Sequence, residues 1–267
     1  MDTLDFLQRV TGSAGYYSLL AIGPKKRRVQ KFYKTAEQLI GAANNFDENG
    51  YDAYFALGRF KNDESREADN VAQMRAFFLD LDCGPTKDYA DQPSALAALR
   101  SFVKQTKLTK PIIVNSGRGI HAYWPLPAPI TRAEWQPIAD RFKSACKSLG
   151  LRIDGSVTAD AARVLRVPGT GNHKDDPPKP VEILAGGAHV EISPEHFDAC
   201  VSPHAKVSAD TVSSSGLFGD KNVRVLVDPK STRETSAVMD ALTSNIESSF
   251  KKIAKRTAEG KGCAQIG

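Results

Sequence analysis

The sequence predicts an α+β fold with a mixed or antiparallel sheet. Short apolar runs typical of strands are interspersed with segments of helical periodicity. Several of the strand-like runs follow one another through tight turns, as strands do in β-hairpins. A mixture of helices with several hairpins is characteristic of the α+β class.

Each expected element rests on a local pattern. Strands are expected where short apolar or aromatic runs are bounded by turn-forming residues. These runs are residues 16–23, 29–33, 51–60, 76–81, 111–116, 117–124 (after a tight turn), 181–184 and 189–192. Helices are expected where apolar residues recur at helical spacing behind a capping residue. The capping residues are Thr35, Ser94 and Thr131, and the corresponding helices run to Ala43, Lys107 and Leu149.

The C-terminal part of the chain has a different character. Residues 201–235 are rich in serine and other turn formers and predict a linker. Residues 236–258 have one apolar helical face. Because a lone amphipathic helix cannot bury its apolar stripe by itself, we expect residues 236–267 to begin a helical segment of a longer protein. The main domain is then expected at residues 1–200.

Composition limits the class of protein. Hydrophobic residues make up 41% of the 267 residues, which is enough for a normal core. The four cysteines form no C-x-x-C pair, which argues against a zinc knuckle and against a disulfide-stapled secreted fold. No apolar run is long enough to span a bilayer, and no signal peptide opens the chain. We expect a soluble, cytoplasmic protein with no membrane partner.

The turn between the first two expected strands carries four consecutive cations, which we call the basic turn: Lys25, Lys26, Arg27 and Arg28. The formal net charge of the chain, +5, permits contact with nucleic acid without demonstrating it. Contacts to DNA phosphates need positive charge and little else. The basic turn is therefore a candidate DNA-binding site, and a solvated hairpin tip is the alternative.

The strand at residues 76–81 leads into two acids, Asp80 and Asp82. Side chains alternate between the faces of a strand, so both carboxylates project from one face and Leu79 and Leu81 from the other. Neighbouring carboxylates repel each other unless a cation lies between them, and carboxylates suit Mg²⁺ or Mn²⁺. Two solvated acids at a strand end are the alternative.

Two further clusters complete a possible site. Ser116, Arg118 and His121 are spaced by Gly117 and Gly119, which let the backbone approach a ligand closely. The other cluster combines an acid with later basic residues: Asp154, Arg163, Arg166, His173 and Lys174. Three carboxylates can hold one or two divalent ions, and the basic side chains suit a triphosphate. This inventory fits nucleotidyl transfer by two metal ions.

In this order, the clusters resemble the three motifs of the archaeo-eukaryotic primase superfamily, and most closely those of the primase-polymerase proteins of phages and plasmids. The resemblance rests on Phe77-Phe78-Leu79-Asp80-Leu81-Asp82, on Ser116-Gly117-Arg118-Gly119-Ile120-His121 and on Ile153-Asp154. Residues 162–174 resemble the run that follows the third motif. The likeness covers residues 16–192.

The resemblance implies a catalytic core with an RRM-like sheet joined to an N-terminal α/β unit. It implies transfer from deoxynucleoside or nucleoside triphosphates to a 3′-hydroxyl on a single-stranded DNA template with a primer, in phage or plasmid replication. A helicase domain or protein would follow the chain, and the location would be the host-cell cytoplasm. The implied Mg²⁺ or Mn²⁺ ligands are Asp80, Asp82 and Asp154, which are catalytic together with His121. The implied nucleotide-binding residues are Ser116, Arg118, His121, Arg163 and Lys174.

Several alternatives stay open. Asp160 competes with Asp154 as the third ligand, and Arg166 could instead pair with a core carboxylate. His189, His196, Cys200 and His204 fit no standard zinc spacing. The chain could be a single-stranded-DNA-binding initiator domain without chemistry, although such a role does not require the acids. It could also be a metal-dependent nuclease.

Overall fold

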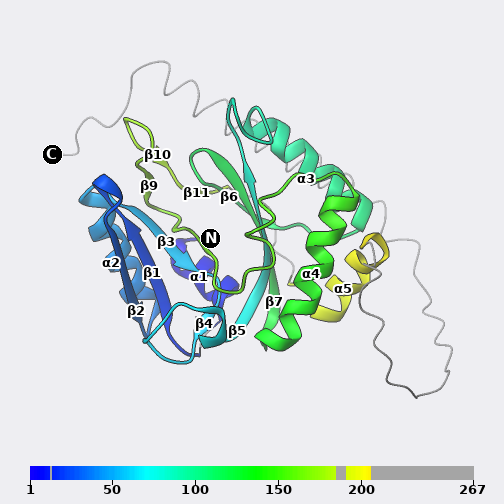
Figure 1. Cartoon of the computed structure of the whole chain (residues 1–267), viewed down its shortest axis with the longest axis horizontal. Helices are drawn as coiled ribbons and strands as arrows, with labels where there is room; N and C mark the ends of the chain where they lie inside the picture. Colours follow the sequence, from blue (N-terminus) through cyan, green and yellow to red (C-terminus); the bar gives the residue numbers. More distant parts are fainter. Residues whose placement is uncertain (13, 185–190, 206–267) are drawn as a thin grey trace. The chain divides into compact units, whose positions relative to one another are not determined.

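Two antiparallel sheets dominate the computed structural model of the chain, which describes residues 1–12, 14–184 and 191–205 (Figure 1). The predicted α+β class is confirmed. The described residues form one unit, Met1–Ala205. The expected linker beyond residue 205 and the expected helical segment at residues 236–267 lie outside the described residues.

The first sheet has four strands in the order β2-β1-β3-β8. A helix that covers this sheet, α2, connects β2 to β3. The bounds are Tyr17–Ile22 (β1), Arg28–Tyr33 (β2), Ala36–Glu48 (α2), Asp52–Ala56 (β3) and Val164–Arg166 (β8). Because β8 comes from late in the chain, this N-terminal sheet is completed only when the rest of the domain has folded.

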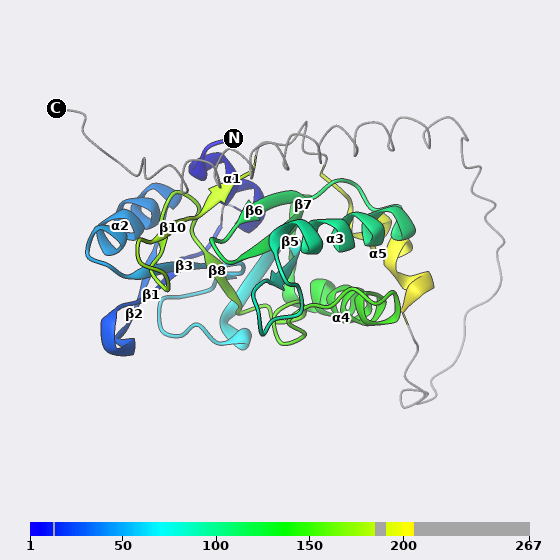
Figure 2. The ribbon, with the colours of Figure 1, turned by 90° about the horizontal axis from the view of Figure 1, so that it is seen from above.

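The second sheet has five strands in the order β11-β6-β7-β5-β4. Helices α3, α4 and α5 lie on one side of this sheet (Figures 1 and 2), and α1 also contacts β5 and β7. The strands are Arg59–Phe60 (β4), Val71–Asp82 (β5), Ile112–Asn115 (β6), Gly119–Thr131 (β7) and Glu182–Ile183 (β11). The helices are Thr3–Thr11 (α1), Gln92–Thr106 (α3), Arg132–Ser148 (α4) and Pro194–Val201 (α5). A small ribbon pairs Gly171–Asn172 (β9) with Lys179–Pro180 (β10).

The two faces of β5 have opposite character, as the alternation of its sequence predicts. Phe77, Leu79 and Leu81 have no exposed surface. The Phe77 ring stacks on Phe197 of α5 with 4.1 Å between ring centroids. This aromatic layer joins the sheet to its helices and leaves the acids of β5 on the other face.

Three elements differ from the sequence prediction. Helix α1, which was not predicted, is capped by Asp2 and buries an apolar stripe that includes Phe6. Helix α2 continues past Ala43 to Glu48, because polar residues on the outer side of a helix are tolerated. The expected strand at residues 51–60 is divided into β3 and β4, which belong to different sheets. The chain crosses between the sheets at Gly58, where a Cβ atom would lie 2.8 Å from the carbonyl oxygen of Ala161.

The starts of the other predicted helices are close to the expected positions. Thr131 caps α4 in a capping box with Glu134, as expected for a helix that begins there. Asp91, not Ser94, caps α3, and its carboxylate accepts a hydrogen bond from the backbone N–H of Ser94 at 2.8 Å. None of the helices in the described part of the chain is long and apolar enough to cross a membrane.

The packing of α5 gives a prediction about stability. Phe197 is fully buried, and its ring centroid lies 5.0 Å from that of Phe142. Phe197→Ala should lower the free energy of unfolding by about 3–5 kcal/mol, because it removes a large buried side chain and leaves a cavity. Urea denaturation measures this loss. Phe32→Ala, on the half-buried edge strand β2, is the matched control and should cost less; an equal loss would show that α5 is not part of the core.

Candidate active site

An open pocket of about 800 Å³ is lined by all eight residues that the sequence analysis assigned to catalysis or nucleotide binding. Strand β5, the β6–β7 turn and the segments at residues 154–163 and 172–179 contribute to it, together with Ile22, Tyr54 and Arg166 of the N-terminal sheet. The basic turn does not line the pocket. The structure therefore brings the three clusters together and places the four expected DNA-binding cations elsewhere.

Asp80 lies at the centre of the acids. It is paired across the sheet with His121, and its Oδ1 atom lies 3.8 Å from His121 Nε2. Burial raises the pKa of Asp80 to about 7, and the charges of Asp82 and Asp154 add to this effect against the opposing charge of Arg163. The three carboxylates therefore interact electrostatically, as expected for acids that share a site.

Asp82 is two residues further along β5, on the same face, opposite Gly119 of β7. Its carboxylate forms an ion pair with Lys87 Nζ at 2.7 Å. Hydrogen bonding to Asp82 raises the pKa of Lys87. Lys87 was not singled out from the sequence, because the loop that carries it has no recognisable motif.

Asp154 lies in a coil segment and not at the end of a strand, in contrast to the prediction for residues 151–154. Its backbone N–H donates to the carbonyl oxygen of Asp80 at 3.3 Å, which places Asp154 beside the end of β5. Its carboxylate accepts from Ser156 and from Arg163 Nη2 at 3.4 Å. Although burial alone would raise the pKa of Asp154, these contacts hold it below the ordinary value.

Asp160, the competing candidate for the third acid, does not line the pocket. Its carboxylate accepts a hydrogen bond from the backbone N–H of Ala162 at 2.9 Å. This is the local capping role that the sequence analysis held open for Asp160. Of the two candidates, Asp154 is the one that lies beside Asp80.

His121 is 4% exposed. Burial lowers its pKa to about 3, and the charge of Arg166 acts in the same direction, so the ring is neutral. Its Nδ1 atom lies 3.2 Å from the hydroxyl oxygen of Tyr123. Because the Tyr123 hydroxyl can donate, we assign Nδ1 as the acceptor and Nε2 as the protonated nitrogen. The N–H group then faces Asp80 and the pocket.

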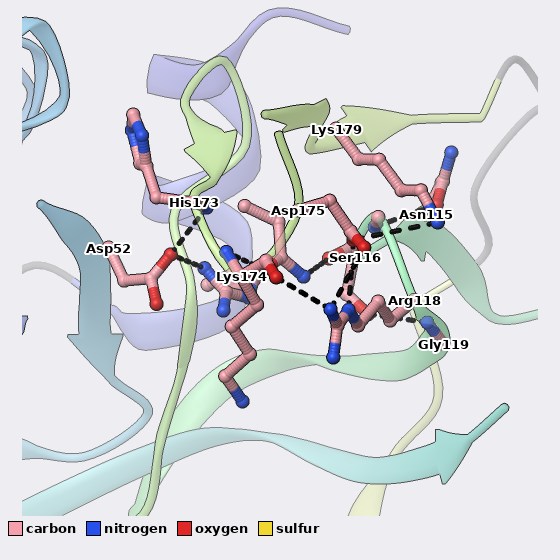
Figure 3. A network of polar contacts seen from close by, with 12 residues as sticks. Asp52, Asn115, Ser116, Arg118, Gly119, His173, Lys174, Asp175 and Lys179 are labelled. Carbon is pink, nitrogen blue, oxygen red and sulfur yellow. Dashed lines mark hydrogen bonds and ion pairs between the residues drawn. The ribbon is translucent and has the colours of Figure 1, made fainter. Parts of the chain in front are cut away.

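The turn that carries Ser116 is held from several sides. Asn115 Oδ1 accepts from the backbone N–H of Gly117 at 2.9 Å and from Gln92 at 2.6 Å. Asn172 donates to the carbonyl oxygen of Ser116 at 2.8 Å (Figure 3). Gly117 has a φ angle of +85°, and a Cβ atom there would lie 2.8 Å from the Asn172 side chain. A larger residue would therefore separate the turn from Asn172.

Residues 171–175, which we call the clasp, join the N-terminal sheet to this turn (Figure 3). The backbone N–H of His173 donates to Asp52 of β3 at 2.8 Å. At the other end, Asp175 accepts two hydrogen bonds from Arg118, at 2.8 and 2.9 Å. Lys174 lines the pocket between these contacts, and its charge lowers the pKa of Asp80. Arg118 is at the pocket rim, with its guanidinium group engaged by the clasp.

Arg166 forms a buried ion pair with Asp52, with 2.7 Å between Nη1 and Oδ1. The pairing with a core carboxylate that the sequence analysis held open is confirmed. The Arg166 guanidinium also lies over the Tyr54 ring, 4.8 Å from its centroid. The sequence analysis did not identify Asp52, Asn115, Asn172 or Tyr54. Asn172 stands within the motif-like run at residues 162–174, which was the one available signal.

No three His, Cys, Asp or Glu side chains of the described residues form a preformed metal cluster. This includes His196, Cys200 and His204, whereas His189 lies outside the described residues. The donor set of the pocket nevertheless suits Mg²⁺ or Mn²⁺, because it consists of carboxylates whose mutual repulsion raises the pKa of Asp80. The three acids are engaged by protein groups instead.

Comparisons with known proteins bear on the fold. No family model matches the chain. The sequence is 27% identical over 152 residues to a replication protein of Clostridium perfringens, a match that covers 56% of this chain. The chain spans 35% of the length of that curated relative.

Solved structures are similar to the chain at low sequence identity. The domain of the cyanophage S-2L primase-polymerase that is described as its AEP domain matches with a TM-score of 0.53 and 16% identity, over 70% of this chain and 89% of that one. The catalytic domain of the primase RepB′, solved in complex with initiator DNA, matches with a TM-score of 0.45 and 13% identity, over 74% and 93% of the two chains. The first of these likenesses shows the fold, and it is the fold that the order of the three motifs predicted.

The Asp52–Arg166 pair gives a prediction about pH. Burial would raise the pKa of Asp52, but Arg166 and the backbone of His173 together hold it below the ordinary value of 3.8. The ionised form therefore stabilises the fold above that pH, and this contribution is lost as the pH falls through the lowered folded pKa. Asp52→Asn should cost about 3–5 kcal/mol near neutral pH, because it leaves Arg166 buried without its counter-charge.

Urea unfolding over a pH series measures the gap between the wild type and Asp52→Asn. The gap should shrink below about pH 4, where Asp52 of the wild type loses its charge. Asp69→Asn is the control, since the Asp69 side chain is 96% exposed although it pairs with Arg132. It should change stability by less than about 0.5 kcal/mol at any pH. A gap for Asp52→Asn that does not depend on pH would exclude the ion pair as its source.

Proposed function

We propose that this chain, which has the fold of an archaeo-eukaryotic primase domain, is the catalytic domain of a DNA primase-polymerase. It would transfer nucleotides from deoxynucleoside or nucleoside triphosphates to a 3′-hydroxyl on a single-stranded DNA template. The supporting observation is that the acids, the Ser116–His121 turn and the later basic residues line one pocket. The similar S-2L domain belongs to a protein named a primase-polymerase, and the curated relative is named a replication protein.

In this proposal Asp80, Asp82 and Asp154 hold Mg²⁺ or Mn²⁺. A bound ion would lower the pKa of the attacking hydroxyl and offset the charge of the leaving pyrophosphate. Binding requires Asp82 to give up Lys87 and Asp154 to give up Arg163, since both acids are paired in the structure. The raised pKa of Asp80 supports cation binding, because repulsion between neighbouring carboxylates is relieved when a cation lies among them.

The remaining pocket residues would bind the phosphates. Ser116 offers a hydroxyl group, and neutral His121 offers an N–H group that faces the acids. Arg163 and Lys174 offer positive charge, and Arg163 can form two parallel hydrogen bonds with phosphate oxygens. Arg118 is held by Asp175, so we propose that it contacts phosphate from the pocket rim while fixing the clasp. The helicase partner and the host-cell cytoplasm stay predictions.

One observation favours a second candidate, a single-stranded-DNA-binding initiator domain without chemistry. The acids have protein partners in the structure, and those of the described residues form no preformed metal cluster. A binding domain, however, has no use for several acids gathered in one pocket with basic residues. Binding of a labelled nucleoside triphosphate that depends on Mn²⁺ separates the two candidates.

The acid pair gives the direct test. Primer extension on a DNA template with Mg²⁺ or Mn²⁺ should fall to background in Asp80→Ala and in Asp82→Ala, because each removes a carboxylate proposed to hold the ion. Asp69→Ala, an acid outside the pocket, is the control and should keep full extension. Extension by the Asp80→Ala/Asp82→Ala double variant would refute the polymerase proposal. Degradation of a labelled single strand without nucleotides would identify a nuclease instead.

The basic turn gives a separate test, because it lies outside the pocket. Its cations are exposed, and Lys25 and Lys26 have left-handed backbone angles that turn the hairpin sharply. Replacing Lys25, Lys26, Arg27 and Arg28 by Gln should weaken the affinity for single-stranded DNA. It should also reduce the dependence of that affinity on salt, by roughly one unit of slope for each lost phosphate contact. An unchanged slope would place the DNA elsewhere on the molecule.

A further inference from the structure

Residues 61–70, which connect β4 to β5 along the side of the N-terminal sheet, carry an arginine that the proposed function does not use. Arg66 is half-buried. Its Nε atom donates to Gln30 of β2 at 3.2 Å, and its Nη1 atom donates to the carbonyl oxygen of Ala162, just before β8. Arg66 therefore joins the β1–β2 hairpin to the segment that carries Arg163.

Strand register shows which face of the sheet these residues share. Arg28 is paired with Ile22, Gln30 with Leu20, and Leu20 with Tyr54. Residues directly opposite each other in antiparallel strands project from the same face. Because Ile22 and Tyr54 line the pocket, Arg28 and Gln30 belong to the face that opens toward it. Arg66, which contacts Gln30, lies over the same face.

Like charges gather along this face. Burial lowers the pKa of Arg66, and the charges of Arg163 and Arg28 act in the same direction, whereas Asp160 opposes them. Arg66 is thus close enough to both other arginines to be repelled by them. Three guanidinium groups held within electrostatic range destabilise one another unless an anion with several charges lies beside them.

We propose that Arg28, Arg66 and Arg163 form a track that binds the phosphate backbone of one nucleic-acid strand and leads it from the basic turn to the acids. The inference rests on the proposed function only for the direction of the strand. Arg28 and Arg66 do not line the pocket, so the track extends beyond the space available to a triphosphate. Half-buried Leu20, Ile22 and Tyr54 on the same face can pack against unpaired bases, which favours a single strand over a duplex.

The track is tested with the full chain by the fluorescence anisotropy of a labelled oligodeoxythymidylate at a series of salt concentrations. Arg66→Gln should lower the affinity and reduce the slope of log affinity against log salt by about 0.7, the value for one phosphate contact on a single strand. Arg28→Gln should do the same. Arg9→Gln is the matched control, because Arg9 is a partly exposed, ion-paired arginine on α1; it should change neither quantity.

A second variant separates charge from structure. Arg66→Lys keeps the positive charge but cannot reproduce both hydrogen bonds to Gln30 and Ala162. It should keep the salt slope of the wild type if the charge contacts phosphate. If both Arg66 variants lose the same slope, the residue has only a structural role, and the track is refuted. A slope for Arg66→Gln equal to that of Arg9→Gln refutes it as well.

Two other readouts distinguish this inference from the proposed function. If the wild type does not extend primers but Arg66→Gln still loses salt slope, the polymerase proposal fails and the track stands. If the wild type extends primers and the slope is unaffected, the track alone fails. Binding of a labelled nucleoside triphosphate without DNA is the third measurement. A loss there with an unchanged DNA slope would assign Arg66 to the nucleotide and overturn the track.

Discussion

Antiparallel pairing of β5 with β7 is the constraint on which the site depends. One face of β5 carries Phe77, Leu79 and Leu81, none of which has exposed surface. A slip of the strand by one residue would bring Asp80 and Asp82 into that apolar layer. The cost of burying unpaired carboxylates therefore fixes the register. The same register sets Asp80 opposite His121, so the hydrophobic core decides the geometry of the polar site.

The pocket depends equally on the clasp, because its two walls belong to different sheets. Asp52 accepts from His173 and pairs with Arg166 on one side, and Asn172 holds the carbonyl of Ser116 on the other. One guanidinium nitrogen of Arg166, Nη2, is buried without a hydrogen-bond partner in the described residues. A hydrophobic pair could fill this space with less desolvation cost. The ion pair therefore makes more sense as a device that positions the clasp than as a source of stability.

Sequence reasoning succeeded where the physical cause was local. Alternation along β5 predicted which face carries the acids, and the capping residue Thr131 predicted the start of α4. It failed where the cause was tertiary. The position of Asp154 depends on a hydrogen bond to the distant Asp80 carbonyl, and the division at Gly58 depends on close approach to Ala161. Neither contact leaves a periodic signal, and the same holds for the roles of Lys87 and Asn172.

The charge balance of the pocket connects its structure to the proposed chemistry. Asp82 and Asp154 are paired with Lys87 and Arg163, while His121 stays neutral. At an effective dielectric constant of about 20, opposite charges 4 Å apart attract by about 4 kcal/mol. An incoming triphosphate with divalent ions would leave that balance nearly intact, because the ions would replace the cationic side chains on the acids and the released side chains could turn to the phosphates. The pairs seen in the structure are therefore compatible with the nucleotidyl transfer that we propose, since they supply both sets of charges that the reaction needs within one pocket.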